Sequence, residues 1–582
     1  MPLDYLLVAS TRPSSDRFAE LDARLGERTN VARGRAEARH LRPGLFALLI
    51  DDGPRPTSLT SSDVDVFDGV ALAGGALVSS LLGTRESPAP SSPGNYFLAR
   101  HAGGDVVVQA DPLGTYPVFV HDHLGLTCIS NNLFLVEQAL ERLGVSVPID
   151  LSQASYIVTL GNGAFDLTGF AGVRLLGPGE VVTVDRDNRA RYVPGDVCRL
   201  LFSDRPYTEL INEAARDLTA SVEAIAKGPF RHRICDLSGG MDSRLVLAAI
   251  LHCRAQEGFE FFTSGAPTTP DAVVAAAIRD RFGLRPAGNV LGRGPALGIF
   301  ESMRYYVGRT SGCFSMTHGP NLGFPITPDI AQIGGSFGEL FRGYYSGQYA
   351  LRARDHQRPG AHALVRLAHS VELKAQRFLT PDALTQHIDR FRDFAARLAG
   401  VVEPDDVPDV FYLQNRTRHH FGARWRIGSY TRTIFQPLYS TAAIQASHKL
   451  PIAERKRNRV TQDLMQCLCP ELADMPYASK SRAPASGTPP PAAPRSAKRS
   501  NLARLLADFF AHHATDVGFQ RMQPVFDPQK VVDFLRTPVD ALESELEVFT
   551  AYRLVAAYIW ANRLELMPPD FEAAAVSAAE PA

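Results

Sequence analysis

One stretch of this 582-residue chain, HRICDLSGGMDSRLVLAAI at positions 232–250, constrains the fold more than any other. Its first part suits a buried strand and its last part an apolar helix. Between them, the six residues SGGMDS (238–243) are too small and too flexible to belong to a core. A strand that ends in a glycine-rich turn and then opens a helix is typical of a phosphate cradle, because backbone N–H groups and the positive end of the helix face the anion.

The residue types in this turn suit phosphate chemistry. Gly239 and Gly240 let the backbone approach an anion closely, and the hydroxyls of Ser238 and Ser243 can donate to the same oxygens. Asp242 would repel phosphate, so its natural role is to hold Mg²⁺ against the phosphates. The turn is not the G-x-x-x-x-G-K-[ST] loop, since it has no lysine and a different spacing. The alternative is an ordinary helix N-cap turn whose glycines are incidental.

The chain divides into two parts with different patterns. The first contains short apolar runs separated by Gly, Pro, Asp and Asn, which indicates a β-rich region. In the second, apolar strands alternate with helices, which predicts a parallel sheet with crossover helices, and toward the C-terminus the pattern is mostly helical. A chain this long exceeds one core. We therefore predict domains at 1–200 and 205–570, with a flexible Pro-, Ser- and Ala-rich insert at 479–500.

Composition limits the partners. The 61 Lys and Arg residues nearly cancel the 62 Asp and Glu residues, so no overall charge recruits a nucleic acid or a membrane surface. The seven scattered cysteines include no CxxC pair, which argues against a disulfide framework and a structural zinc site. The N-terminal MPLDYLLVAS lacks the basic region of a signal peptide, and no apolar run is long enough to span a membrane. We expect a cytoplasmic protein that binds neither nucleic acid nor membrane.

The SGGMDS turn resembles the pyrophosphate-binding loop of ATP-pyrophosphatases, and its surroundings resemble the asparagine synthetase family, which includes the β-lactam synthetases and the lasso-peptide cyclases. Further patches are similar to segments of that family and occur in the same order: DPLGTYPVF (111–119), TGFAGVRLLGPGEVVTV (168–184), FTSGAPTTPDAVVAAAI (262–278) and IGGSFGELFRGYY (333–345). The resemblance implies an α+β N-terminal sandwich of the Ntn-hydrolase type. It also implies a following α/β ATP-pyrophosphatase domain (adenine nucleotide α-hydrolase-like) with a helical C-terminal part.

The resemblance also assigns residues to a nucleotide site. Thr263 and Gly335 match segments that bind the nucleotide, and Lys480, in MPYASKSR, takes the place of a late catalytic lysine that neutralises developing charge. Glu339 aligns with a metal-binding aspartate when GSFGELFRGYY is matched without gaps to G-E-G-x-D-E-x-F-G-G-Y. Shifting the alignment by one residue places Gly338 there instead. The competing interpretations are a plain surface lysine for Lys480 and a helix-starting acid for Glu339.

Two departures from the family pattern narrow the expected chemistry. Glutamine-using members begin with a cysteine that attacks the glutamine amide, whereas residue 2 here is Pro2 and no cysteine precedes Cys128. The first domain is therefore expected to be a degenerate class II glutamine amidotransferase-like domain that releases no ammonia. Arg244, directly after the turn, differs from the Ser or Thr common there in asparagine synthetases and lasso-peptide cyclases, so neither subgroup is assigned.

We therefore expect an ATP-dependent, AMP- and pyrophosphate-forming amide ligase that uses Mg²⁺. Its substrate, a small molecule or a peptide, would carry a carboxylate to be adenylated, and the amine would not come from glutamine. A lactam or macrolactam would result where one substrate carries both groups, and a homodimer is left open. Two other functions compete: a non-catalytic member of the fold that binds nucleotide or a partner, and a tRNA-modifying thiolase, which would need a basic surface and paired cysteines.

Overall fold

The computed structural model describes the chain in separate stretches. They are residues 3–12, 16–22, 24–25, 35–51, 58–59, 64–80, 88–89, 91–288, 290, 299–310, 327–345, 376–429, 431–478 and 497–564. These residues form three sheets and many helices. The prediction of a protein that mixes α and β structure is therefore confirmed.

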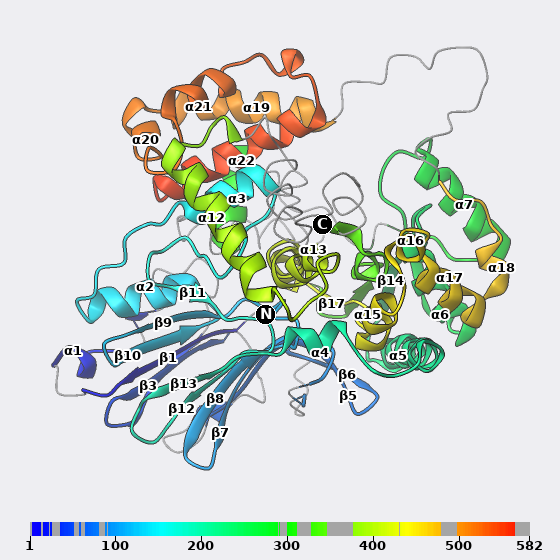
Figure 1. Cartoon of the computed structure of the whole chain (residues 1–582), viewed down its shortest axis with the longest axis horizontal. Helices are drawn as coiled ribbons and strands as arrows, with labels where there is room; N and C mark the ends of the chain where they lie inside the picture. The colour runs from blue at the N-terminus through cyan, green and yellow to red at the C-terminus, as the bar shows by residue number, and fades with distance from the viewer. Residues whose placement is uncertain are drawn as a thin grey trace, which may run out of the picture.

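The first part of the chain is built on two antiparallel sheets (Figure 1, lower left). The six-stranded sheet has the order β11 (Arg174–Leu175), β9 (Phe119–His123), β10 (Leu126–Ser130), β1 (Asp4–Ser10), β3 (Leu45–Asp51), β2 (Arg35–Arg42). The seven-stranded sheet has the order β13 (Ala190–Val193), β12 (Val181–Val184), β8 (Asp105–Ala110), β7 (Gly94–Ala102), β5 (Val64–Ala73), β4 (Ser58–Leu59), with β6 (Ala76–Ser79) paired to β5. Every pairing within these two sheets is antiparallel.

Strand β1 is buried on both faces, because its successive side chains enter two different apolar cores. Tyr5 and Leu7 belong to the apolar core that the two sheets enclose, together with side chains of β5, β7, β8 and β12. Leu6 and Val8 point to the opposite face, because successive side chains of a strand alternate. There they join the core formed with helices α2 (Leu133–Arg142) and α3 (Ser152–Leu160). The first part is thus a sandwich with helices on its outer face.

The DPLGTYP turn between β8 and β9 is organised by one carboxylate. Asp111 is fully buried and accepts hydrogen bonds from the backbone N–H groups of Leu113, Thr115 and Tyr116 and from the Thr115 hydroxyl. A buried carboxylate requires such partners, because burial without them is costly. The motif that the sequence analysis singled out here therefore shapes a turn of the sandwich.

The second part contains a parallel sheet with the order β15 (Glu260–Phe262), β14 (His232–Asp236), β16 (Ile330–Ile333), β17 (Thr433–Phe435). β14 leads into α6 (Met241–His252) and β15 into α7 (Pro270–Phe282), so both strands feed crossover helices. Helix α7 begins where Thr269 accepts from the Ala272 N–H and ends at Gly283, whose φ is +62°. The other helices around this sheet are α4 (Val197–Leu201), α5 (Tyr207–Lys227), α13 (Val407–Phe411), the π-helix η6 (Tyr412–Gly422), α14 (Ala423–Ser429), α15 (Thr441–His448), α16 (Ile452–Lys456), α17 (Arg459–Leu468) and α18 (Pro470–Ala473).

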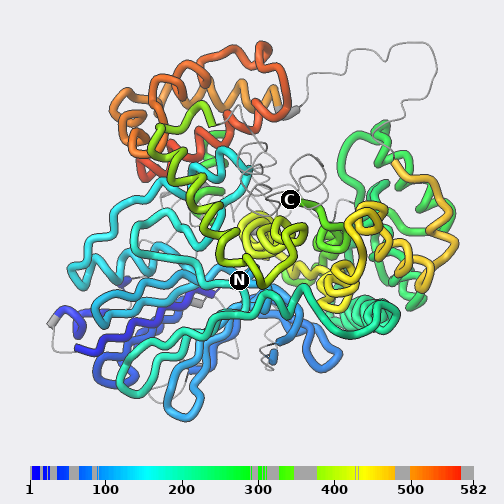
Figure 2. The backbone as a smooth tube through the Cα atoms, viewed as in Figure 1, coloured from blue at the N-terminus to red at the C-terminus, as the bar shows by residue number. Residues whose placement is uncertain are grey.

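The last helices pack on the sandwich side of the molecule. They are α19 (Ala497–His512), α20 (Asp516–Gln520), α21 (Pro528–Leu535) and α22 (Glu545–Ala561), accompanied by α8 (Ile299–Arg309) and α12 (Pro381–Leu398). Figure 2 shows the red α22 beside the cyan α3, and these helices share one apolar core with α2 and α3. Trp560 Nε1 donates to the Gly169 carbonyl (3.1 Å), and Arg563 forms a bidentate ion pair with Glu137.

Two observations bear on the predicted domains 1–200 and 205–570, which stay a prediction. The core of the last helices crosses the boundary between the segments 1–200 and 205–570, because it contains residues of both. The predicted flexible insert 479–500 overlaps α19, so its last four residues are helical rather than an irregular loop. The rest of the insert, 479–496, lies outside the described residues. Composition alone favoured an irregular segment, but the apolar side chains that begin at Leu502 bury α19 in the core.

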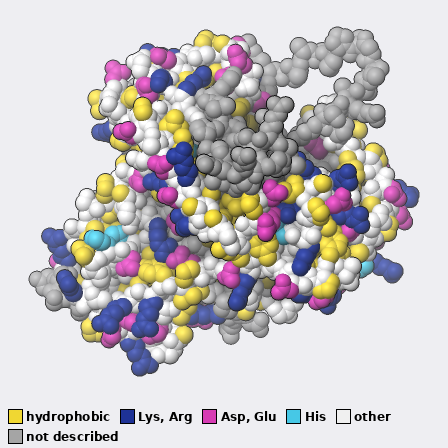
Figure 3. Space-filling model, in the orientation of Figure 1, with side chains coloured by type: hydrophobic (Ala, Val, Ile, Leu, Met, Phe, Trp, Pro, Cys, Tyr) yellow, Lys and Arg dark blue, Asp and Glu magenta, His cyan; other side chains and the backbone are white. Residues whose placement is uncertain are grey.

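Charges on the visible surface are mixed. On the face shown in Figure 3, basic and acidic side chains are interspersed. Within the described stretches, no helix is both long and apolar enough to cross a bilayer.

Candidate functional site

The carboxyl edge of the parallel sheet holds the candidate site. From β14 the chain moves to β15 on one side, and later to β16 on the other, so the direction of strand succession reverses next to β14. Open α/β sheets bind ligands in the crevice outside the carboxyl ends of two such strands. The segments that follow β14 and β16 are the SGGMDS turn and residues 334–338. Both sequence motifs therefore reach the same edge.

The two segments are in direct contact, which explains their glycines. A Cβ atom on Gly335 would come within 2.7 Å of the Ser243 nitrogen, and one on Gly338 within 2.4 Å of the Asp242 carboxylate carbon. Only glycine allows a backbone to approach so closely. The structure thus places Gly335, a predicted site residue, against the turn that carries five of the other predicted residues.

The turn closes on its own hydroxyls. The Ser238 N–H donates to Ser243 Oγ (3.1 Å), the two serine hydroxyl oxygens lie 3.0 Å apart, and the Gly240 N–H donates to Ser238 Oγ (3.1 Å). These groups lie at the N-terminus of α6, where an oxyanion can accept from the same donors. The Gly239 N–H donates to the Asp271 carboxylate (3.1 Å). Asp271 was not predicted from the sequence. Its carboxylate therefore takes up one backbone N–H of the turn.

Two carboxylates border the turn. Asp242, in the first turn of α6, forms a bidentate ion pair with Arg342 (3.1 and 2.8 Å). Glu339 lies beside it on the 3-10 turn η5 (Gly338–Arg342). Burial raises the pKa of both carboxyls; the Asp242 charge raises the pKa of Glu339 further, and Arg342 opposes both shifts. The structure thus brings the two predicted metal ligands together and adds an arginine that the sequence analysis did not foresee.

Glu339 carries an unsatisfied atom. Its Oε2 is buried and has no hydrogen-bond partner within the described part of the chain. A buried carboxylate oxygen without a partner is costly, and a second carboxylate beside it adds repulsion. A cation between the two carboxylates would relieve both penalties.

Phe337 holds this segment in a strained conformation. Its φ is +80°, in the left-handed region that bulky residues rarely adopt. The buried ring packs against Trp425 (4.8 Å between ring centroids), Tyr439 (5.1 Å) and Phe421 (6.4 Å). This aromatic packing offsets the strain and fixes the turn that carries Glu339 toward Asp242.

Thr263 lies at the same edge, directly after β15. Its hydroxyl donates to the Leu237 carbonyl (2.8 Å) and accepts from Arg279 Nη1 (3.1 Å). Leu237 directly precedes the SGGMDS turn. The Thr263 side chain therefore joins the ends of β14 and β15 beside the predicted phosphate cradle.

A third carboxylate, Asp236, ends β14. It accepts a hydrogen bond from Gln332 Nε2 (2.8 Å), and Gln332 Oε1 accepts one from Arg432 Nε (2.6 Å). Burial raises the pKa of Asp236 from 3.8 to about 6, although Gln332 and Arg432 act in the opposite direction. The sequence analysis did not single out this residue. An aspartate at the end of an apolar strand was the available signal.

Two predicted residues, Lys480 and Pro2, lie outside the described stretches. The described stretch that precedes Lys480 ends at Ala478. The Ala478 N–H donates to the Gly239 carbonyl (3.2 Å). The segment that leads to Lys480 therefore contacts the turn two residues before the lysine.

The neighbouring histidines of η6 form no metal site. His419 is buried and its Nε2 contacts the Phe165 carbonyl (2.8 Å). Burial and the Arg418 charge lower the pKa of His419 to about 3. Within the described residues, no cluster of three or more His, Cys, Asp or Glu side chains could hold a metal ion. The contacts of His419 are therefore those of a packed side chain.

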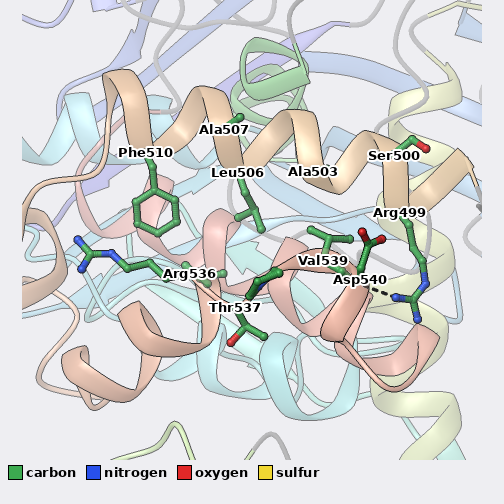
Figure 4. Close-up of a pocket in the computed structure, with 12 residues that line it drawn as sticks. Arg499, Ser500, Ala503, Leu506, Ala507, Phe510, Arg536, Thr537, Val539 and Asp540 are labelled. Carbon is green, nitrogen blue, oxygen red and sulfur yellow. Dashed lines mark hydrogen bonds between the residues drawn. The ribbon is translucent and has the colours of Figure 1, made fainter.

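A separate cavity of about 410 Å³ lies among the last helices, between α19 and residues 535–540 (Figure 4). Leu506 and Phe510 of α19 line it, and Arg499 donates to the carbonyls of Val539 (2.8 Å) and Leu542 (2.9 Å) at one end. The residues around it contain no glycine-rich turn and one acidic side chain, Asp540. Its lining therefore does not resemble the predicted phosphate cradle at the sheet edge.

Comparisons with known proteins give limited information. No protein-family profile matches the chain, and no curated protein matches it. Among solved structures, it is similar to the glutamine phosphoribosylpyrophosphate amidotransferase from B. subtilis complexed with ADP and GMP, with 10% identity, 59% of this chain and 77% of that chain covered, and a TM-score of 0.19. It is also similar to an allosteric regulatory enzyme of purine biosynthesis, with 10% identity, 60% and 76% covered, and a TM-score of 0.20. TM-scores this low establish no shared fold, so the resemblance to the asparagine synthetase family stays a prediction from the sequence motifs.

Proposed function

We propose that this protein is an ATP-dependent amide ligase that forms AMP and pyrophosphate. The observation that carries the proposal is that the SGGMDS turn, which contains Asp242, meets the segment that contains Glu339. They meet at the point where the strand order reverses. Donors at a helix N-terminus suit the leaving pyrophosphate, and a carboxylate pair beside them suits the divalent cation that accompanies ATP.

The proposed reaction has two steps. A carboxylate oxygen of the substrate attacks the α-phosphorus of ATP, and the bond to the β-phosphate oxygen breaks with release of pyrophosphate. An amine then attacks the acyl carbon of the acyl-adenylate, loses a proton and displaces AMP. The hydroxyls of Ser238 and Ser243 and the Gly240 N–H would hold the pyrophosphate, because hydrogen bonds among them already gather these groups at the N-terminus of α6. Lys480 would neutralise the charge that develops on the leaving group.

The residues present fit a magnesium ion. Mg²⁺ in nucleotide sites is bound by one or two carboxylates together with phosphate oxygens and water, and the buried Oε2 of Glu339 has no other partner among the described residues. Asp242 and Glu339 would hold the ion, which would supply charge neutralisation for the phosphates. Arg342 would remain beside them as a fixed positive charge.

The conformation of Phe337 supports the alignment that gives Glu339 the metal position. In that alignment Phe337 matches the second glycine of G-E-G-x-D-E, and glycine adopts a positive φ at no steric cost. Phe337 has φ +80°. In the alignment shifted by one residue, Phe337 would match the unspecified position, where nothing calls for a positive φ.

The amine is proposed to come from the substrate rather than from glutamine. No cysteine precedes Cys128, and the Cys128 thiol is fully buried, which raises its pKa and keeps it unreactive. A substrate that carries both the amine and the carboxylate would give a lactam or macrolactam. A second molecule or free ammonia would give an open amide.

Pyrophosphate release from Mg·ATP, measured over a panel of small-molecule and peptide carboxylates, tests the proposal. Asp242→Asn and Glu339→Gln are each expected to lower the rate about 100-fold, because each removes a carboxylate that organises the cation. Asp280→Asn, an exposed change on α7, is the matched control and should leave the rate unchanged. Equal rates for all four proteins would exclude the assigned site.

The ion pair between Asp242 and Arg342 favours one alternative. Because Arg342 neutralises Asp242 in both of its hydrogen bonds, the crevice could bind nucleotide without the cation that catalysis requires. A non-catalytic nucleotide-binding protein of this kind would bind ATP equally well with and without Mg²⁺ and release no pyrophosphate with any substrate. Calorimetry of ATP binding with and without Mg²⁺ separates the two functions.

A further inference from the structure

Arg244 is a buried charge that the proposed chemistry does not use. It lies in the first turn of α6, directly after the SGGMDS turn, and its side chain is completely inaccessible to solvent. Burial lowers its pKa. A buried guanidinium is expensive unless its donors are satisfied, so its contacts indicate what it does.

The recorded contacts of Arg244 go to backbone carbonyls and to one ring, while its Nε has no hydrogen-bond partner within the described stretches. Its guanidinium donates to the carbonyl oxygens of Met475 (2.9 Å), Pro476 and Gly239 (3.3 Å). Its central carbon lies 3.9 Å from the centre of the Tyr477 ring, which is a cation–π contact. Arg244 therefore clamps the segment 475–478 onto the turn, from 231 residues away in the chain.

The clamp sets the orientation of one peptide group in the turn. The Gly239 carbonyl accepts from Arg244 and also from the Ala478 N–H (3.2 Å). In a planar trans peptide the C=O of one residue and the N–H of the next point in opposite directions. Holding the Gly239 carbonyl against segment 475–478 therefore turns the Gly240 N–H toward Ser238 Oγ, which accepts it at 3.1 Å.

The steric fit of the segment supports the same arrangement. A Cβ atom on Gly239 would come within 2.4 Å of the Ala478 side chain. The glycine thus permits the close approach that the clamp requires, in addition to any contact with phosphate. A carbonyl that faced the cradle instead would repel an anion, so the direction of this peptide decides whether the turn can bind one.

We propose that Arg244 is a positioning residue that presets the phosphate turn and seats the segment Met475–Ala478 against it. It acts by holding the Gly239 carbonyl away from the anion and by fixing Met475–Ala478 beside the turn. This inference rests on the proposed function for its catalytic consequence, but not for the clamp itself.

The test compares Arg244→Ala and Arg244→Lys with Arg233→Ala. Arg233 is the matched control, since it also donates to two backbone carbonyls, those of Ile225 (3.0 Å) and Gly228 (2.7 Å), but starts from β14 away from the turn. Hydrogen–deuterium exchange of a peptide spanning 470–478 and binding of inorganic pyrophosphate with Mg²⁺ are measured first. Both Arg244 variants should speed exchange of this peptide at least tenfold and weaken pyrophosphate binding, while Arg233→Ala should do neither.

Catalysis is measured second, as pyrophosphate release. Arg244→Ala should lower kcat about 100-fold and also raise KM for ATP, because the same turn is proposed to hold the phosphates of ATP. Millimolar guanidinium should restore part of the rate of Arg244→Ala and none of any loss in Arg233→Ala. A wild-type rate for Arg244→Ala would overturn the catalytic consequence of the clamp.

The two parts fail separately. If the wild-type protein releases no pyrophosphate with any substrate, the proposed function fails, and the exchange and binding measurements still judge Arg244. If Arg244→Lys leaves exchange of 470–478 and pyrophosphate binding at wild-type values, the clamp is overturned whatever the activity. Arg244→Lys keeps the positive charge and the aliphatic part of the side chain. It therefore allows the test to be made even if Arg244→Ala does not fold.

Discussion

At the scale of single residues, the charged side chains around the crevice have protonation states and partners that differ from those of the same side chains in water. Asp236 keeps its proton to a pH well above that of a free carboxyl, and Asp242 is tied to Arg342. Asp271 accepts from a backbone N–H that an anion would use. These states follow from burial and from neighbours far away in the sequence, and each gives a measurable effect.

Replacing Asp236 by Asn should change stability in a pH-dependent way. The pKa of Asp236 rises from 3.8 to about 6 on folding, so the folded protein binds more protons than the unfolded chain between these values. Its contribution to stability is therefore present below pH 3.8 and lost as the pH rises toward 6. Asp236→Asn retains an acceptor for Gln332 and should raise the free energy of unfolding at pH 8 by about 1–2 kcal/mol.

Urea unfolding at pH 8 and pH 4.5 checks this, with the exposed Asp204→Asn as control. The gain for Asp236→Asn should shrink or disappear at pH 4.5. A gain of equal size at both pH values would show that the carboxylate does not titrate between them.

Replacing Asp271 by Asn should tighten the binding of phosphate groups. The change removes a negative charge that competes for the Gly239 N–H, so the dissociation constant of magnesium pyrophosphate should fall about fivefold, which corresponds to about 1 kcal/mol. Calorimetric titration measures it, and Asp280→Asn on the same helix provides the comparison. Weaker binding would instead assign Asp271 to holding the turn open for the anion.

The sequence predicted those parts of the site that are local. The strand, the turn and α6 follow one another within 21 residues, so hydrophobic pattern, glycines and helix start could be read together. Arg342 lies 100 residues from Asp242, and segment 475–478 lies more than 230 residues from Arg244. No periodicity links such pairs, and only the packed structure brings them together.

At the scale of elements, helix α14 joins the two halves of the molecule through one side chain. Arg426 is buried and forms ion pairs with Asp68 (3.2 Å) of β5 and Asp4 (3.5 Å) of β1. Its guanidinium also lies 4.7 Å from the centre of the Tyr116 ring. The second half of the chain thus places a cation inside the sandwich, next to two buried aspartates.

Replacing Arg426 by Met should destabilise the protein strongly. Removing one partner leaves buried carboxylates behind, which typically costs about 3–5 kcal/mol. Arg424→Met, an exposed change on the same helix, should cost little. Guanidinium unfolding of both variants at pH 7 measures the difference, and similar midpoints would mean that the aspartates find other compensation.

The type of each element could be predicted from the sequence better than its first and last residues. Alternating strands and a later parallel sheet follow from period-two and strand–helix patterns, and both are present. The start of α19 within a Pro- and Ser-rich segment was not predicted, because residues 497–500 carry no apolar pattern of their own. They become helical as the first turn of a helix whose later residues are buried.

At the scale of the whole molecule, the apolar core that contains α22 joins the sandwich to the last helices. That core includes side chains from β1, β3, α2 and α3 and from all four of the last helices. Trp560 contacts Phe134 (6.0 Å between ring centroids) and Phe170 (5.4 Å) across it. The sandwich and the last helices therefore behave as one unit, although the parallel sheet lies between them in sequence.

Ending the chain after residue 496 should unfold more than the helices it removes. The truncated protein would expose the apolar faces of α2 and α3, so it should bind the dye ANS strongly and aggregate. A chain ending at Leu564 retains α19 to α22 and is the matched control. A soluble, monomeric truncation without dye binding would show that the sandwich completes its core without these helices.

The shared core also has a consequence for synthesis of the protein. Helix α3 ends at residue 160 and its partner α22 begins at residue 545, so close to 400 residues must be translated between them. At about 5–20 residues per second this takes roughly 20–80 seconds. During that interval a nascent chain presents the apolar faces of α2 and α3 without the helices that will cover them. Contacts so distant in sequence also form slowly once both partners exist. The ribosome-bound chain is thus a natural client for chaperones that recognise exposed apolar helices.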